Sequence, residues 1–185
     1  MSLDTDLIPA SEVVARARSQ IGRKTKYELG RGGHYPDSLM PADSVGRCDC
    51  SGFVAWCFRE PRKVQLSIYK PYLGNWVETS AIVRDAHRIG VGLFDIVTTK
   101  DALPGMVLVY GDKGKGQGHV GIISEIGAHG PAKVIHCSKG NFDNFGDAVR
   151  ETGPEIFVSH GAIVARCIAA DYGNAVGFVE RIPSA

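Results

Sequence analysis

Apolar residues recur at helical spacing in two stretches near the start of the chain. In the first, Ser11 can cap a helix that carries apolar residues on one face: Val13, Val14, Ala17 and Ile21. In the second, Cys50 continues an apolar stripe with one-, three- and four-residue intervals: Phe53, Val54, Cys57 and Phe58. Because such intervals place side chains on one face of a helix, the pattern predicts two helices, separated by a Gly/Pro-rich loop at residues 30–47.

The second half of the chain changes to short runs of β-branched and other apolar residues between turn residues. These runs predict strands near 105–110, 119–125 and 132–137, and again around 160–168 and 176–182. Helices followed by antiparallel strands indicate an α+β fold, with the helix that starts at Cys50 packed on an antiparallel β-sheet. We expect residues 1–185 to form a single domain.

Residues 61–104 interrupt this order and are expected to form a mobile insertion. The segment ends in the pattern of a helix over residues 78–89, with Glu78, Ile82, Val83 and Ala86. Before that helix lies an aromatic cluster: Tyr69, Tyr72 and Trp76. The cluster could line a cleft or simply cover the core, and the pattern favours neither alternative.

The composition is that of an ordinary globular protein, with 185 residues, 44% hydrophobic and 22% charged, and a formal net charge of +1. That balance gives no reason to expect a nucleic-acid partner. The sequence contains no run of about 18 apolar residues, so we expect no membrane span. The Gly-rich stretch at 111–118 lacks the ending of a phosphate loop, so we expect a flexible hairpin connection there.

Two of the five cysteines, Cys48 and Cys50, stand one residue apart. Zinc sites built from cysteine usually space a pair by two to four residues and add a second cysteine pair or a histidine pair. The remaining cysteines are scattered along the chain. We therefore expect no metal site and no cofactor.

One cysteine and two histidines stand where catalytic chemistry is favoured. Cys50 lies at the N-terminal turn of its helix, where unpaired backbone N–H groups and a nearby imidazole should lower the pKa of the thiol. His119 and His136 fall on strands expected to be neighbours, with the Cys50 helix laid against them, so a nucleophile, its base and an orienting residue would meet on folding. Ser138 could orient the base in place of His136.

The remaining residues of these types have plainer interpretations. A cysteine on an apolar stripe is usually a small core residue, and we keep that interpretation for Cys57. The other histidines are expected at the surface or in turns: His34, His87, His129 and His160.

Together these motifs resemble the NlpC-type family of cell-wall cysteine endopeptidases, papain-like hydrolases of peptidoglycan stem peptides. The resemblance covers roughly residues 11–140. It rests on segment 17–22 with Tyr27 and the glycine pair 32–33, on 49–53 around the cysteine, on the proline-glycine turn at 103–106, and on 118–122 around the first histidine. Segment 59–103 is longer than in the shortest examples of the family, and a Gly/His/Pro insertion stretches the spacing from His119 to His136. Substrate contacts in these regions are therefore not carried over.

The resemblance implies a papain-like fold in which Cys50 is the nucleophile, His119 the general base and later the acid, and His136 the residue that orients the imidazole. It places three further residues in the site, where such positions help bind a free amine of the substrate: Tyr27, Asp49 and Ser51. The nucleophile must stay reduced, so no disulfide framework is expected among the five cysteines.

The implied activity is hydrolysis of a peptide bond in peptidoglycan stem peptides, for example between D-glutamate and the diamino acid, through an acyl-enzyme. The alternatives are a cysteine acyltransferase or deamidase of the same fold that acts on a protein or another amide, or a binding module with an idle triad.

Peptidoglycan lies outside the cytoplasm, so we expect action on the cell wall or in the periplasm. The start of the chain does not have the pattern of a secretory signal. We expect either a signal removed beforehand or a signal-less route such as phage lysis or a secretion system, which would make the protein bacteriolytic. A delivery or immunity protein would then be a partner whose identity the sequence does not give.

Overall fold

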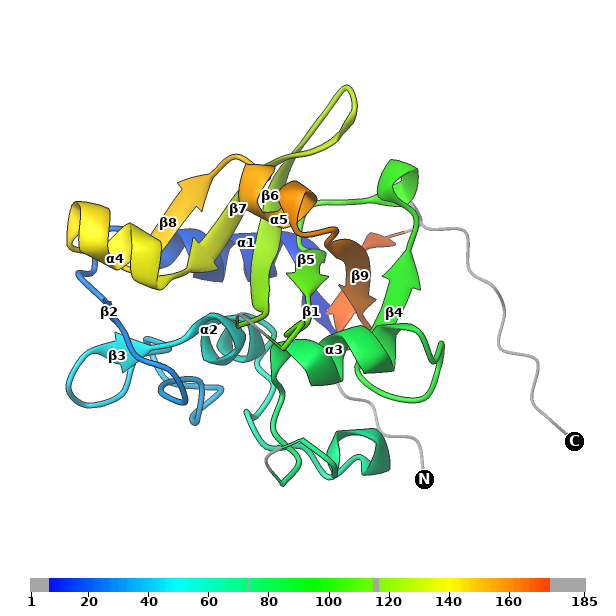
Figure 1. Cartoon of the computed structure of the whole chain (residues 1–185), viewed down its shortest axis with the longest axis horizontal. Coiled ribbons are helices and arrows are strands. Elements are labelled where there is room, and N and C mark those ends of the chain that lie inside the picture. The colour runs from blue at the N-terminus through cyan, green and yellow to red at the C-terminus, as the bar shows by residue number, and fades with distance from the viewer. Residues whose placement is uncertain (1–6, 73, 115–116, 174–185) are drawn as a thin grey trace, which may run out of the picture.

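The computed structural model describes residues 7–72, 74–114 and 117–173, and their centre is a six-stranded antiparallel sheet (Figure 1). The strands stand in the order β4-β9-β5-β6-β7-β8. Their bounds are Phe94–Val97 for β4, Val107–Tyr110 for β5, His119–Gly127 for β6, Gly130–Cys137 for β7, Val149–Thr152 for β8 and Ile163–Cys167 for β9. Two short parallel pairs lie outside this sheet: β1 Ile8–Pro9 with β10 Ala170–Asp171, and β2 Lys26–Tyr27 with β3 Arg47–Cys48.

Helices surround the sheet and close its ends. The α-helices of the described ranges are α1 Ala10–Ser19, α2 Cys50–Cys57, α3 Thr79–Ala86, α4 Lys139–Phe145 and α5 Glu155–Ser159, with short 3₁₀ turns η1 Ser67–Tyr69 and η2 Thr99–Asp101. Figure 1 shows α4 with β8 at one end of the sheet and β4 with β9 at the other, with α2 between them. The central position of α2 brings its first turn to the middle strands.

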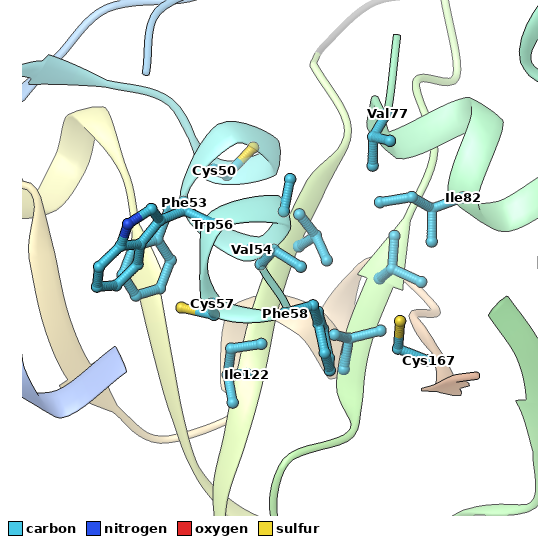
Figure 2. Packing of buried hydrophobic residues seen from close by; sticks show 14 of the residues in the cluster. Cys50, Phe53, Val54, Trp56, Cys57, Phe58, Val77, Ile82, Ile122 and Cys167 are labelled. Carbon is cyan, nitrogen blue, oxygen red and sulfur yellow. The ribbon is translucent and has the colours of Figure 1, made fainter. Parts of the chain in front are cut away.

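Of the helices in the described ranges, α2 is the most buried, because all eight of its residues are buried. Its apolar side chains pack on β6 and β7, and each fully buried aromatic or aliphatic side chain contributes roughly 1.5–3 kcal/mol to stability. Figure 2 shows Phe53, Val54 and Phe58 inside the cluster with Ile122 of β6, while the sulfur of Cys50 at the opposite end of the helix points away from Phe58. The body of the helix is therefore fixed by core packing, while its first residue, Cys50, lines a cavity.

The middle of the sheet is buried on both faces, since successive side chains of a strand point to opposite faces and each face has its own apolar cluster. Val107 and Val109 of β5 belong to the main cluster beside α2, whereas Met106 and Leu108 belong to a second cluster with Phe157 of α5. The two faces explain why the strands read as continuous apolar runs in the sequence.

These elements confirm the α+β fold with the Cys50 helix packed on an antiparallel sheet. The strands predicted near 105–110, 119–125 and 132–137 are β5, β6 and β7, the one near 160–168 is β9, and the helix expected over 78–89 is α3. The strand expected at 176–182 lies outside the described residues. That residues 1–185 form a single domain stays a prediction.

Two expectations differ from the structure. Helix α1 begins at Ala10 behind Pro9 with no side-chain cap, so Ser11 is not the capping residue. The segment 61–104, expected as a mobile insertion, supplies α3 and the edge strand β4. It is anchored because Tyr69 is fully buried and donates its hydroxyl proton to Oδ2 of buried Asp85 at 2.6 Å.

Candidate active site

Cys50 is the first residue of α2 and sits against strand β6. Asp49 caps the helix, and its Oδ1 atom accepts the backbone N–H of Gly52 at 2.8 Å. The Cys50 side chain is buried, and its sulfur lies near the backbone N–H groups of Val120 and Ser51 and near the Tyr27 hydroxyl. Because Val120 follows His119 in β6, this position places the candidate nucleophile beside the strand that carries the candidate base.

The two histidines stand on neighbouring strands and bond to each other. Nε2 of His119, on β6, lies 2.7 Å from Nδ1 of His136, on β7, and their rings meet edge to face at 82°. Gly121 makes room for this arrangement, since a Cβ there would come within 2.8 Å of the His136 Cβ. The bond uses Nε2 of His119, which leaves its Nδ1 as the ring nitrogen available to a substrate or a thiol.

Ser138, the alternative residue for orienting His119, makes a different contact. Its hydroxyl caps α4 by accepting the backbone N–H of Asn141 at 3.1 Å. Of the two residues that the sequence offered as partners for the base, the structure therefore joins His136 to His119.

Burial governs the protonation of the site. It raises the pKa of Cys50 to about 12, with the neighbouring Asp49 carboxylate adding to the rise, although the N–H groups of Val120 and Ser51 and the Arg62 charge oppose it. The expectation of a lowered thiol pKa was wrong, because the loss of hydration outweighs the favourable helix N-terminus. The Cys50 thiol is therefore neutral at rest.

The histidines are also neutral at rest. Burial lowers the pKa of His119 to about 3, assisted by repulsion from His136 and His160, and lowers the pKa of His136 to about 4. A neutral imidazole can accept a proton, so the pair can act as a general base toward a thiol that is deprotonated only as it attacks.

Asp49 is fully occupied by donors of the protein itself. Its Oδ1 accepts from Gly52 N–H and the Ser51 hydroxyl, and its Oδ2 accepts from Gly30 N–H at 2.7 Å and from Arg62 Nη2. A carboxylate offers about four acceptor positions, and these contacts fill them. The side chains of Asp49 and Arg62 are 1% and 3% exposed, so the pair is a buried ion pair at the foot of the site.

Arg62 also ties the glycine loop to this pair. Its Nη1 donates to the backbone carbonyl of Arg31 at 2.7 Å and to that of Gly32 at 3.1 Å. Gly33 packs directly on α2 with a φ of +70°, and a Cβ there would lie 2.3 Å from the Gly52 carbonyl. The ion pair and the loop together fix the start of the helix that carries Cys50.

Two cavities meet at the site. One, of about 650 Å³, is lined by Cys50, Asp49, Ser51, Arg62, Leu29 and Trp76 among others. The other, of about 520 Å³, is lined by Tyr27, Tyr110, His119, His136, Lys139 and Glu155 among others. Both share Gln117 and Gly118, so they form two halves of one cleft, with the cysteine on one side and the histidines on the other.

Of the aromatic residues Tyr69, Tyr72 and Trp76, which the sequence placed either along a cleft or over the core, one lines the cleft and two pack in or against the core. Tyr69 is fully buried in the main core, whereas Trp76 lines the cysteine-side cavity and stacks on the Arg62 guanidinium at 4.5 Å. Tyr72 is partly buried and packs against the core.

Several residues in contact with the histidines or their neighbours were not predicted from the sequence. Phe157 of α5 stacks on the His119 ring with centroids 5.2 Å apart, and Thr152 of β8 lies 3.0 Å from Nε2 of His136. Exposed His160 stacks on Tyr110 at 4.7 Å. Only the strand order reveals these contacts, because nothing in the local sequence marks them.

All five cysteines are buried free thiols. Among the residues that the structure describes, no group of three or more histidine, cysteine or acidic side chains could hold a metal ion. No helix within the described ranges has the length and apolar character needed to cross a bilayer.

Comparison with models of known protein families gives a match for this chain. A family model described as a CHAP domain matches residues 41–141, more than half of the chain and a range that contains Cys50, His119 and His136. No curated protein matches the chain. The CHAP domain is a cysteine peptidase or amidase domain of the papain-like peptidoglycan hydrolases. The group expected from the sequence is confirmed at this level, while the match is not to the NlpC-type family itself.

Proposed function

This chain belongs to the CHAP domain family, and we propose that it hydrolyses an amide bond in peptidoglycan stem peptides with Cys50 as its nucleophile. The observation that supports this best is the 2.7 Å contact between His119 Nε2 and His136 Nδ1, one residue away from the Val120 N–H that lies near the Cys50 sulfur. It leaves Nδ1 of His119 as the proton acceptor.

In the first half of the reaction, the Cys50 sulfur attacks the substrate carbonyl carbon as its proton passes to Nδ1 of His119. Negative charge develops on the carbonyl oxygen, and the backbone N–H of Cys50 at the start of α2 would stabilise it. The Tyr27 hydroxyl, whose pKa is raised chiefly by burial, keeps its proton and supplies a second donor. His119 then gives the proton to the leaving nitrogen, the C–N bond breaks, and an acyl-enzyme thioester remains.

In the second half, water replaces the amine. His119 takes a proton from water as the oxygen attacks the thioester carbon, the C–S bond breaks, and the proton returns to the sulfur. His136 holds the ring throughout. Because both histidines are neutral at rest, each half-reaction begins with an unprotonated base.

The two halves of the cleft correspond to the two sides of the scissile bond. The acyl part must stay attached to Cys50, which lines the cavity with Trp76 and Leu29. The leaving amine must meet His119, which lines the cavity with Lys139 and Glu155. We assign acyl binding to the first cavity and amine binding to the second.

For the bond itself, the resemblance to NlpC-type enzymes favours the link between D-glutamate and the diamino acid. Tyr27 and Ser51 are our candidate substrate contacts. Asp49, whose acceptor positions are filled, would act by holding Ser51, Gly30 and Arg62 in place rather than by binding a substrate amine. The site of action is the cell wall, and delivery by a phage or secretion system stays a prediction.

Digestion of purified peptidoglycan in H₂¹⁸O tests the proposal. Hydrolysis puts one ¹⁸O atom into each new carboxyl terminus and releases a free amine, which mass spectrometry of the fragments detects. Unlabelled new amide bonds to an added amine would favour an acyltransferase, and release of ammonia without chain cleavage would favour a deamidase.

A further inference from the structure

His136 makes two contacts, one through each ring nitrogen. Its Nδ1 lies 2.7 Å from Nε2 of His119, and its Nε2 lies 3.0 Å from Oγ1 of Thr152. A neutral imidazole carries one N–H donor and one acceptor, so one contact must be a donation and the other an acceptance. The direction decides which nitrogen of His119 carries its proton.

The Thr152 hydroxyl sets that direction. Its single proton is donated to the backbone carbonyl of Gly153 at 2.9 Å. Its oxygen can therefore only accept from the Nε2–H of His136. Nδ1 of His136 then accepts from the Nε2–H of His119, and Nδ1 of His119 keeps its lone pair.

The opposite arrangement would disable the base. If the Thr152 hydroxyl donated to Nε2 of His136, Nδ1 of His136 would carry the proton and donate to Nε2 of His119. The proton of His119 would then lie on Nδ1, where a base must have none. In that arrangement the Gly153 carbonyl would also lose its bond from Thr152.

Strand pairing holds Thr152 in this position. Thr152 is the last residue of β8, and the register of β7 with β8 pairs His136 with Arg150. Residues two apart on a strand share a face, so Thr152 lies diagonally across from His136 on the same face. Its β-branched side chain has restricted rotamers, which limits the positions open to the hydroxyl.

We infer that Thr152 is a positioning residue whose hydroxyl fixes the protons of His136 and His119, so that His119 presents an unprotonated Nδ1 to the Cys50 thiol. The inference rests on the proposed function for its consequence in catalysis. The proton positions themselves are properties of the resting protein.

Long-range ¹H–¹⁵N NMR of the histidine rings measures those positions without any substrate. In the wild-type protein we expect both His119 and His136 to be protonated at Nε2. In Thr152→Val, which keeps the shape and removes the hydroxyl, we expect a mixture in which Nδ1–H forms appear, and Thr152→Ser should restore the wild-type spectrum. Thr98→Val, at an exposed threonine hydroxyl outside the site, is the matched control.

Kinetics on stem peptides supply the second readout. A positioned general base typically contributes about 10²- to 10⁴-fold to a rate, and loss of the Thr152 hydroxyl should forfeit part of that. We expect Thr152→Val to lower kcat by about 10-fold or more with KM unchanged. Thr152→Ser should recover most of the rate, and Thr98→Val should change neither parameter. A wild-type His119 protonated at Nδ1, or ring spectra and kcat unaffected by Thr152→Val, would overturn the inference. If Thr152→Val fails to fold, the wild-type spectrum and Thr152→Ser still decide. A wild-type protein with the expected spectrum but no hydrolysis would overturn the proposed function alone.

Discussion

Nε2 of His119 lies 2.7 Å from Nδ1 of His136, and the two rings are buried on neighbouring strands of one sheet. His136, which we propose as the residue that orients His119, is thus a neutral group with both a donor and an acceptor, unlike a carboxylate. The charged groups lie apart from the histidines, in the buried Asp49–Arg62 ion pair beside Cys50.

Replacement of His136 separates orientation from packing. We expect His136→Ala to lower kcat on stem peptides by about 10²-fold or more, because His119 loses the partner of its Nε2–H. His136→Asn and His136→Gln should recover part of the rate, since an amide oxygen can accept the same bond. Equal rates for all three variants, accompanied by equal losses of thermal stability, would indicate that His136 is only a core residue.

The depressed histidine pKa values predict how stability depends on pH. An unfolded histidine has a pKa of about 6.5, whereas the folded values are about 3 for His119 and about 4 for His136. Between these limits the unfolded chain binds more protons, so the free energy of unfolding should be highest above the unfolded pKa and fall as the pH drops below it. Urea denaturation between about pH 7 and 5 measures this fall.

The variant His136→Gln tests the cause of that slope. It removes one of the two depressed groups, so its stability should fall less steeply than that of the wild type over the same pH range. His87→Asn, at an exposed histidine, should keep the wild-type slope. An unchanged slope in His136→Gln would mean that other groups carry the pH dependence.

The Asp49–Arg62 pair should matter for stability far more than surface pairs do. Removal of one partner of a buried ion pair typically costs about 3–5 kcal/mol, because the other charge stays buried. Arg62→Met should show a loss of that order in urea denaturation. Arg18→Met breaks the exposed pair with Glu151 and should cost less than about 1 kcal/mol. Similar losses for both variants would contradict the assigned burial.

The filled acceptor positions of Asp49 predict how the enzyme treats substrate ends. With no free position for an ammonium, free and N-acetylated tripeptides should be cut at rates within about 10-fold, a difference of about 1.4 kcal/mol. Kinetics on the two synthetic peptides decide this. Much faster cleavage of the free peptide would restore the amine-binding role that the resemblance implies for Asp49.

Sequence patterns predicted the elements with strong apolar signals and missed the polar ones. The α2 stripe and the β-branched runs of β5, β6 and β7 were readable because burial leaves a regular spacing. Strand β8, with the sequence VRET, and α4, with KGNFDNF, carry too few apolar residues for such a signal. Their places follow from tertiary packing, and Thr152 could not be linked to His136 without them.

The site shows the same division. Cys50, His119 and His136 stood out by residue type and position, and the structure joins the two histidines as expected. The direction of the Cys50 pKa shift could not be predicted, because the sequence shows the helix N-terminus but not the depth of burial. Arg62 gave no signal, since a single arginine in a loop is usually solvated.

Digestion of purified peptidoglycan by the wild type, Cys50→Ala and Cys48→Ala, followed by mass spectrometry of the soluble fragments, tests the central claim most directly. The wild type should release stem-peptide fragments with new termini at one bond. Cys50→Ala should lower that rate by more than about 10³-fold while its circular dichroism stays native, and Cys48→Ala should keep most of the activity. Fragment release by Cys50→Ala at the wild-type rate would contradict the assignment of Cys50 as the nucleophile.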